Sequence, residues 1–203
     1  MDFIDNSPDW PYSRAKTAVI RAAASVIRES GPRAATLKNI AQKAGITEPA
    51  IFRHFDGVDG LFEGLFFAFE SYVARINATF DRPQKGLDRV LGAARASLEL
   101  YGQNKDFAYL VLHAEHIFRG YDGMRKRLAE LRTTDQAGAL AAFEEAAQLG
   151  QLRNEMLPRL AALSVMATLV YSVQGWIESE VDMDIVGFAF GRINDLVSMF
   201  KIF

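Results

Sequence analysis

The chain offers little of the side-chain chemistry that catalysis requires. It has three histidines and no cysteine, so thiolate nucleophiles, disulfides and cysteine metal sites are excluded. No Ser-His-Asp arrangement, Cys-His pair or glycine-rich phosphate loop stands at a recognisable spacing. We therefore expect no enzymatic activity and no cofactor.

One short run, His113-Ala114-Glu115-His116, has the composition of a metal site. On a helix the two imidazoles, three residues apart, share a face while Glu115 points elsewhere. A zinc site needs a third ligand from another element, and a di-iron carboxylate site needs a Glu-x-x-His spacing that the chain lacks. We predict no metal site and interpret these histidines as core or surface residues.

Basic side chains are concentrated near the N-terminus, although the whole chain carries a net charge of −2. Residues 14–55 contain eight bases and two acids, a net +6. Residues 1–13 contain three acids and no base, and residues 56–203 contain fifteen bases and twenty acids, giving −3 and −5. A basic segment in an acidic protein indicates one surface that meets nucleic acid.

The basic segment contains the pattern of two short helices joined by a tight turn. Apolar residues recur at helical spacing from Leu37 to Ala44, after Thr36 as the N-cap. Gly45 can supply the positive φ at which a helix commonly ends. We therefore predict a first helix that begins after Thr36 and ends at this glycine.

A second helix follows directly. Thr47 can cap it and Pro49 fits its first turn, where a missing N–H costs nothing. We expect Ile46, Ile51 and Phe55 to face inward. Two short helices with this turn form a helix-turn-helix, whose second helix can enter the DNA major groove.

Helical periodicity continues through the chain, and no strand period or internal repeat is present, so the fold class is all-α. A helix over 14–30 should pack on the helix-turn-helix to make a trihelical core. Further helices are predicted over 61–80, 87–101, 107–118, 124–149, 159–179 and 184–200. The helix over 124–149 is either continuous or broken near Gly138.

The last two predicted helices are apolar on more than one face. One face can pack within the subunit, and the other would expose a patch larger than soluble monomers usually tolerate. This favours a homodimer through these helices, the alternative being that both are central in a monomeric bundle. The predicted dimer interface comprises Leu163, Val170, Trp176, Phe188, Ile193 and Phe200.

The first thirteen residues are acidic and lack an apolar signal core, and no uninterrupted run of about eighteen apolar residues follows. We expect a flexible arm over 1–13, no membrane partner and a cytoplasmic location.

Residues 14–69 resemble the tetracycline-repressor (TetR) family of bacterial transcriptional regulators. The shared pattern comprises Glu-Ser-Gly at 29–31, a Thr at 36, Ile-Ala-x-x-Ala-Gly-Ile-Thr at 40–47 and aromatic-x-His-Phe at 52–55. The remainder resembles the family in helix count and in its apolar terminal pair. The resemblance implies a helix-turn-helix DNA-binding domain over 14–60 and a larger ligand-binding and dimerisation bundle over 61–203.

The resemblance also implies a function. The chain would be a sequence-specific DNA-binding transcriptional regulator, a repressor released from double-stranded operator DNA by a small hydrophobic or aromatic effector. The alternative is a helical ligand carrier or interaction protein with weak or no DNA binding.

Carried over position by position, the resemblance implies a DNA-facing set at the start of the first helix and along the second. This set is Thr36, Lys38, Thr47, Glu48, Pro49, Ala50, Phe52, Arg53 and His54. Phe52 lacks the phosphate-binding hydroxyl of the Tyr common there, and Val58 stands where a Lys is usual. Glu48 can accept from a cytosine amino group or pair with the helix dipole. We expect DNA binding that is weakened rather than lost.

The implied pocket should be lined by aromatic and polar inward positions of the fourth to eighth helices, each of which could alternatively be core. The candidates are Phe66, Phe69, Tyr72, Tyr109, Leu112, His113, Phe143, Met166, Tyr171 and Gln174.

Overall fold

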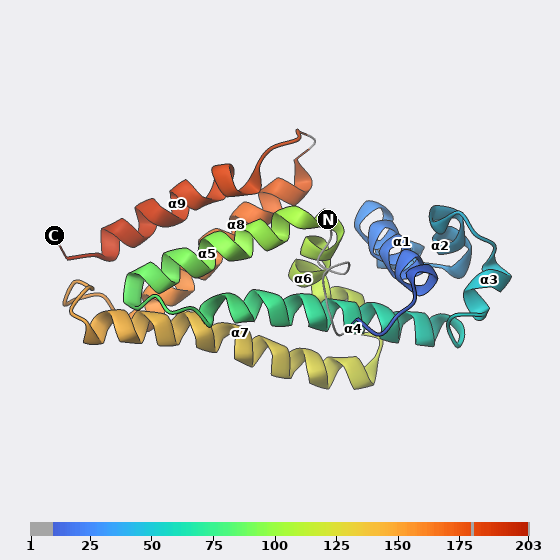
Figure 1. The fold of residues 1–203 in the computed structure, drawn as a ribbon, viewed down its shortest axis with the longest axis horizontal. Coiled ribbons are helices and arrows are strands. Elements are labelled where there is room, and N and C mark those ends of the chain that lie inside the picture. Colours follow the sequence, from blue (N-terminus) through green and yellow to red (C-terminus); the bar gives the residue numbers. More distant parts are fainter. Residues whose placement is uncertain (1–9, 180, 203) are drawn as a thin grey trace. The chain divides into compact units, whose positions relative to one another are not determined.

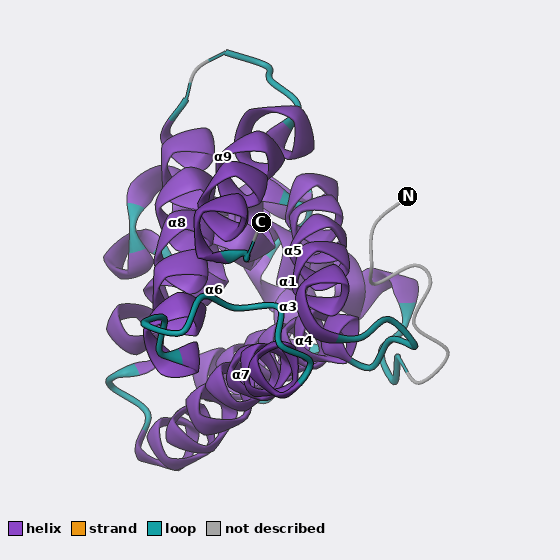
Figure 2. Cartoon of the chain, turned by 90° about the vertical axis from the view of Figure 1, so that its left-hand side faces the viewer, coloured by secondary structure: helices purple, strands orange, loops and turns teal. Residues whose placement is uncertain are grey.

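The computed structural model describes residues 10–179 and 181–202, with backbone only for 132–136. Within them the chain is helical and has no strand, which confirms the all-α class (Figures 1 and 2). The α-helices are α1 (Arg14–Ser30), α2 (Leu37–Ala44), α3 (Glu48–Phe52), α4 (Gly57–Asn77), α5 (Gly86–Gln103), α6 (Lys105–Phe118), α7 (Asp122–Gln148), α8 (Pro158–Glu178) and α9 (Ile185–Phe200). The 3-10 turns η2 (Pro32–Ala34) and η3 (Ala78–Phe80) follow α1 and α4.

Helix α7 resolves an alternative that the sequence left open, because it runs through Gly138 without a break. A Cβ atom at Gly138 would lie 3.0 Å from the ring of Phe80. That is tighter than ordinary van der Waals contact, so a side chain at this position would require the Phe80 ring to shift. The residue that suggested a break is instead explained by packing.

The chain forms two compact units. Unit 1 comprises Met1–Tyr72 and Asn104–Lys126, and unit 2 comprises Val73–Gln103 and Arg127–Phe203. Unit 1 therefore holds α1, α2, α3 and α6, and unit 2 holds α5, α8 and α9. The functional boundary between residues 60 and 61 stays a prediction.

The core of unit 1 is built around α1, which packs against both α2 and α6. Ile20 and Ile27 of α1 and Ile40 of α2 are completely buried. Aromatic rings extend this core: Phe66 lies 5.4 Å from Phe69 between ring centroids. Helix α3 contacts α2 and buries Ile51 completely, so α1, α2 and α3 bury their apolar side chains together, as their spacing predicts.

Three predicted pocket residues belong to this core. Phe66, Phe69 and Tyr72 are 0%, 3% and 0% exposed. The ring of Phe66 meets that of Phe118 edge to face at 4.8 Å, and Tyr72 lies 5.9 Å from Phe107. Each of these rings thus contacts at least one other aromatic ring of unit 1, and their assignment to a ligand pocket stays a prediction.

In unit 2, the start of α5 is held by side chains from α7 and the turn after it. The backbone N–H of Gly86 donates to Glu145 Oε2 at 2.8 Å, and that of Leu87 donates to Gln151 Oε1 at 2.9 Å. Arg89 Nη2 lies 3.4 Å from the same Glu145 oxygen. These contacts satisfy N–H groups that have no partner within the helix, so α5 is fixed against α7.

Helices α5, α8 and α9 pack together in unit 2 (Figure 2). By length and composition alone, α8 could cross a membrane, with a mean hydropathy of 1.5 and 39% of that window buried. This is weak evidence, since core helices meet the same criterion. Because other residues interrupt the apolar run of α8, the sequence alone predicts no membrane-spanning helix there.

Half of the predicted dimer interface lies inside the subunit. Trp176, Ile193 and Phe200 are 8%, 0% and 6% exposed within a single chain, and Trp176 Nε1 donates to Met183 O at 3.0 Å. Their i, i+4 stripes turn toward neighbouring helices, so these side chains leave little surface for a second subunit. Leu163 and Val170 on α8 are exposed as expected.

Phe188, the sixth residue of that set, is half-buried on α9. The guanidinium of Arg192 lies over its ring, 3.9 Å from the centroid. Part of this ring is therefore covered by a cation of the same helix.

Candidate nucleic-acid interface and apolar cavity

Helix α2 begins and ends as its sequence predicts. Thr36 Oγ1 accepts a hydrogen bond from Asn39 N at 3.3 Å, which supplies a partner for an N–H at the helix start. Gly45 follows the last residue in the left-handed conformation, with φ of 68°. The N–H of Ile46 then donates to Ala41 O at 3.0 Å. A cap and a glycine turn thus set the angle at which the chain enters α3.

Helix α3 is short (Figure 1). Two buried side chains anchor it. Ile51 is 0% exposed and Phe55, just beyond the helix, is 6% exposed. Thr47 occupies the N-cap position, but its side chain makes no cap hydrogen bond. Ile46 is 37% exposed, contrary to the expected inward position, because it lies in the turn directly after Gly45.

Most of the predicted DNA-facing residues lie on the surface of unit 1. Of the nine, seven are exposed, while Ala50 and His54 are half-buried. Phe52 is 57% exposed and Val58 is 39% exposed, so both apolar departures from the family pattern also face outward. The outward sides of α2 and α3 are therefore available for a large partner.

A further cation lies beside the end of the α3 region. Lys16 Nζ is 5.3 Å from the ring centroid of Tyr12 and 5.2 Å from that of Phe55. Lys16 is not among the predicted DNA-facing residues, and its only indication in the sequence is its place in the basic segment. The two rings favour a cation near the helix-turn-helix surface.

Residues 10–13 of the predicted N-terminal arm pack on α1 and α4 within unit 1. Trp10 Nε1 donates to Thr17 Oγ1 at 2.7 Å, and the Trp10 and Tyr12 rings lie 5.9 and 5.6 Å from that of Phe67. Residues 1–9 lie outside the described residues.

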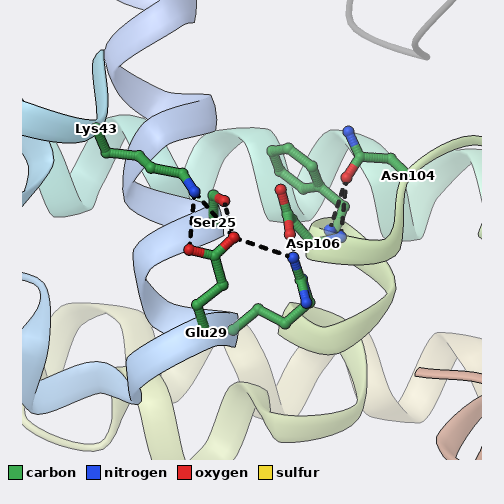
Figure 3. A network of polar contacts seen from close by, with 7 residues as sticks. Ser25, Glu29, Lys43, Asn104 and Asp106 are labelled. Carbon is green, nitrogen blue, oxygen red and sulfur yellow. Dashed lines mark hydrogen bonds and ion pairs between the residues drawn. The ribbon is translucent and has the colours of Figure 1, made fainter. Parts of the chain in front are cut away.

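A polar network joins α2 to α1 (Figure 3). Lys43 Nζ donates to both carboxylate oxygens of Glu29, at 2.9 and 2.8 Å. Ser25 Oγ donates to Glu29 Oε1 at 3.2 Å, and Arg28 Nη2 lies 3.3 Å from the same oxygen. The end of α2 is thereby tied to the end of α1.

The same network continues to α6 (Figure 3). Arg28 Nε donates to Asp106 Oδ1. Asp106 stands in the first turn of α6, whose N-cap Asn104 accepts from the N–H groups of Asp106 and Phe107 at 3.1 Å each. The charge of Asp106 is therefore placed at the positive end of α6. Arg28 and Asp106 thus connect α6 to α1, the same helix whose Glu29 binds Lys43 of α2.

The pKa of Glu29 is lowered below its ordinary value of 4.5, chiefly by the hydrogen bond from Lys43, with Ser25 and Arg28 adding to the effect against an opposing desolvation. A carboxyl group whose pKa is lower in the folded state stabilises the fold at pH values above its unfolded-state pKa. This stabilisation is lost as the pH falls through the folded-state pKa. The pair is partly exposed, at 40% and 42% for the two side chains.

We expect Glu29→Gln to lower the free energy of unfolding by less than about 1 kcal/mol at pH 7, because exposed ion pairs contribute little. The difference from the wild type should disappear as the pH is lowered through and below about 4.5. Urea unfolding at several pH values measures it. A difference that grew in acid would contradict the assignment.

Unit 2 contains an apolar cavity of about 60 Å³. Its walls come from the end of α4, η3, α5, α7 and α8. The lining residues are Ile76, Phe80, Val90, Ala94, Ser97, Tyr101, Ala139, Phe143, Val165, Met166, Leu169 and Val170. Phe143 and Met166 were among the predicted pocket residues. Most of the other lining residues are small or aliphatic, such as Ala94, and give no aromatic or polar indication in the sequence. Phe80, Ser97 and Tyr101 do carry aromatic or polar side chains but were not predicted.

The remaining predicted pocket residues do not line this cavity. Tyr109, Leu112 and His113 are half-buried on α6 in unit 1, where the Tyr109 and His113 rings lie 4.2 Å apart. Tyr171 is 78% exposed. Gln174 donates to Glu178 on the outside of α8.

His113 Nε2 is buried without a hydrogen-bond partner among the described residues, and His116 is exposed. In the part of the chain that the structure describes, no group of three or more metal-ligating side chains is brought together.

Comparison with known proteins adds independent information. Residues 19–65 match the family described as bacterial regulatory proteins, tetR family. Nucleoid occlusion factor SlmA of Alteromonas mediterranea is 26% identical over 117 residues, 57% of this chain and 60% of that protein. HTH-type transcriptional repressor BepR of Brucella suis is 25% identical over 178 residues, 84% of each chain.

Among solved structures, ketosteroid transcriptional regulator KstR2 of Mycobacterium tuberculosis is similar with a TM-score of 0.81. The two are 16% identical, and the match covers 95% of this chain and 97% of that one. This similarity extends the shared fold beyond the helix-turn-helix to both units. The chain spans 60% of the length of the SlmA relative.

Proposed function

We propose that this chain, whose residues 19–65 match the family of bacterial regulatory proteins, tetR family, is a sequence-specific DNA-binding transcriptional regulator. It acts as a repressor that leaves its operator when a small ligand binds in unit 2. The observation that carries this proposal is the exposed α2 and α3 surface in a segment of net charge +6.

The DNA contact is assigned to α3 and the start of α2. Ile51 and Phe55 are buried and fix α3, while Arg53 and Lys38 point their charges outward. Such cations neutralise phosphates and position the protein, whereas residues at the start of the recognition helix read base edges. Thr47, Glu48 and Pro49 stand there. The supporting geometry is a rigid buried side with a polar, exposed side.

The proposed assembly is a homodimer through α8 and α9, located in the cytoplasm with its operator DNA. Leu160, Leu163 and Val170 are 54%, 47% and 44% exposed on α8, an apolar surface that a second copy would cover. A two-fold dimer presents two recognition helices to half-sites about 34–36 Å apart. Trp176, Ile193 and Phe200 of the predicted interface are buried within one chain and are therefore left out of this proposed surface.

The proposed effector site is the apolar cavity of unit 2. Its walls are helices, lined mainly by hydrophobic side chains with few polar groups, as small-molecule sites usually are. Phe143 and Met166 contribute to it. The activity proposed is binding and release, and no catalytic step is assigned.

A gel shift with the DNA upstream of the protein's own gene tests the proposal. Sequence-specific retardation against a scrambled duplex supports the regulator. Absence of retardation at low salt supports a helical ligand carrier or interaction protein instead.

Replacing Val58 with lysine should tighten DNA binding across all sequences. Val58 is 39% exposed in the first turn of α4, where a cation can reach a phosphate. Each neutralised phosphate adds about 0.9 to the log–log salt slope for duplex DNA, so the slope should steepen by about that amount per subunit. Titrations at several salt concentrations measure it, with Val58→Gln as the uncharged control. Equal slopes for both variants would refute the contact.

A further inference from the structure

The cavity of unit 2 is lined without a charged side chain. Ile76, Val90, Phe143, Val165 and Leu169 are among its apolar walls, and Ser97 and Tyr101 are its hydroxyl-bearing residues. An ionised carboxylate or amine placed there would lose its hydration without gaining a counter-charge from the wall, which is strongly unfavourable. The composition of the wall therefore selects an uncharged occupant.

The hydrogen-bond direction at Ser97 is fixed by its neighbour. Thr79 Oγ1 donates its single proton to Ile76 O at 2.7 Å. Thr79 Oγ1 and Ser97 Oγ are 3.1 Å apart, and by position either could be the donor. Because the shorter bond to Ile76 O takes the Thr79 proton, we assign the proton between the two hydroxyls to Ser97. Ser97 and Thr79 are 3% and 5% exposed, which shields this chain of hydrogen bonds from solvent. Ser97 thus has no proton left to donate and can only accept.

We propose that this cavity binds a neutral, largely apolar small molecule that carries a hydrogen-bond donor, a hydroxyl or N–H group, and presents it to Ser97 Oγ. The inference deepens the proposed function and rests on it for the ligand's role as effector. An apolar ligand lacking a donor can enter but leaves the Ser97 lone pairs unused. A ligand whose only polar group is an acceptor gains nothing at Ser97.

The size of the cavity sets the size of the probes. At about 60 Å³ it is well below the roughly 300–1,000 Å³ of drug-sized sites, so a ligand must widen it. Met166 lies in the wall, and methionine adapts readily because it is unbranched and flexible. Single-ring molecules are therefore the appropriate first probes.

The test is isothermal titration calorimetry of the protein at pH 7, without DNA, using phenol, toluene and benzoate as ligands. Phenol is a neutral donor, toluene lacks the donor, and benzoate is charged. Because phenol is better hydrated than toluene, the informative quantity is the ratio of the two affinities in the wild type and in Ser97→Ala. We expect this ratio to fall about fivefold to tenfold in the variant, the effect of one neutral hydrogen bond. Toluene should bind the wild type and Ser97→Ala with equal affinity. Benzoate should bind the wild type at least about tenfold more weakly than toluene does.

Thr79→Val provides a second, independent variant. This substitution removes the acceptor of the Ser97 proton, so Ser97 can donate it to a ligand. Anisole can only accept a hydrogen bond, and its affinity relative to that of toluene should rise by a similar factor. A chemical-shift change of the Met166 methyl group on adding toluene places the probe in this cavity.

The proposal is overturned by an unchanged phenol-to-toluene ratio in Ser97→Ala, by benzoate binding as tightly as toluene, or by no binding of either neutral probe at millimolar concentration. None of these readouts involves DNA. A protein that binds phenol through Ser97 but retards no duplex refutes the proposed function alone, and one that binds DNA with an unchanged ratio refutes this inference alone.

Discussion

Replacing Lys38 and Arg53 together with glutamate is expected to lower the affinity for operator DNA by at least about a hundredfold at physiological salt. Both side chains are exposed on the proposed DNA-binding surface. A dimer would lose four phosphate contacts, each contributing about 0.9 to the log–log salt slope, and would gain four charges that phosphates repel. Fluorescence anisotropy with a duplex selected by the wild type from a random library measures the loss.

A matched control separates this surface from net charge. Lys85→Glu combined with Lys126→Glu changes the charge equally, at exposed positions outside residues 14–55. The control pair should retain most of the affinity, and all four substitutions should leave unfolding nearly unchanged, as surface changes usually do. If both pairs weaken binding equally, α2 and α3 do not make the DNA contact.

Truncating Phe66 to alanine is expected to lower the free energy of unfolding by about 3–5 kcal/mol, the usual cost of removing a buried aromatic side chain. Phe66 is 0% exposed, and its ring contacts those of Phe69 and Phe118. The truncated protein would lose both the transfer free energy of the buried ring and its contacts with the neighbouring rings. Urea unfolding measures the change.

Phe66→Leu is the control, since it keeps most of the apolar volume and should cost clearly less. The same experiment distinguishes a packing role from a ligand-lining role. If Phe66 only packs in unit 1, the phenol-to-toluene affinity ratio of the folded Phe66→Leu protein equals that of the wild type. A changed ratio with little loss of stability would return Phe66 to the pocket.

The polar network gives unit 1 a connection that neither helix-turn-helix geometry nor core packing requires. Glu29 holds Lys43 of α2, and the adjacent Arg28 holds Asp106 of α6. Because residues 28 and 29 are neighbours in α1, the end of this helix contacts both α2 and α6 through ion pairs. Exposed ion pairs of this kind contribute little stability, so their effect lies in fixing orientation.

Local features of the DNA-binding region could be predicted from the sequence because they depend on short-range physics. The cap at Thr36 and the left-handed turn at Gly45 are set by residues within one turn of each other. Helix α1 begins and ends at the predicted residues, since its apolar periodicity and the following Gly31 are unambiguous. The all-α class followed from the same periodicity over the whole chain.

Only the tertiary structure decided which apolar residues face which partner. Phe66, Ile193 and Phe143 look alike in sequence, yet one packs in unit 1, one in the core of unit 2 and one on a cavity. Periodicity identifies an apolar face but not the helix that covers it. The acceptor character of Ser97 likewise depends on Thr79, eighteen residues away. Its proton is directed by a contact that no local pattern encodes.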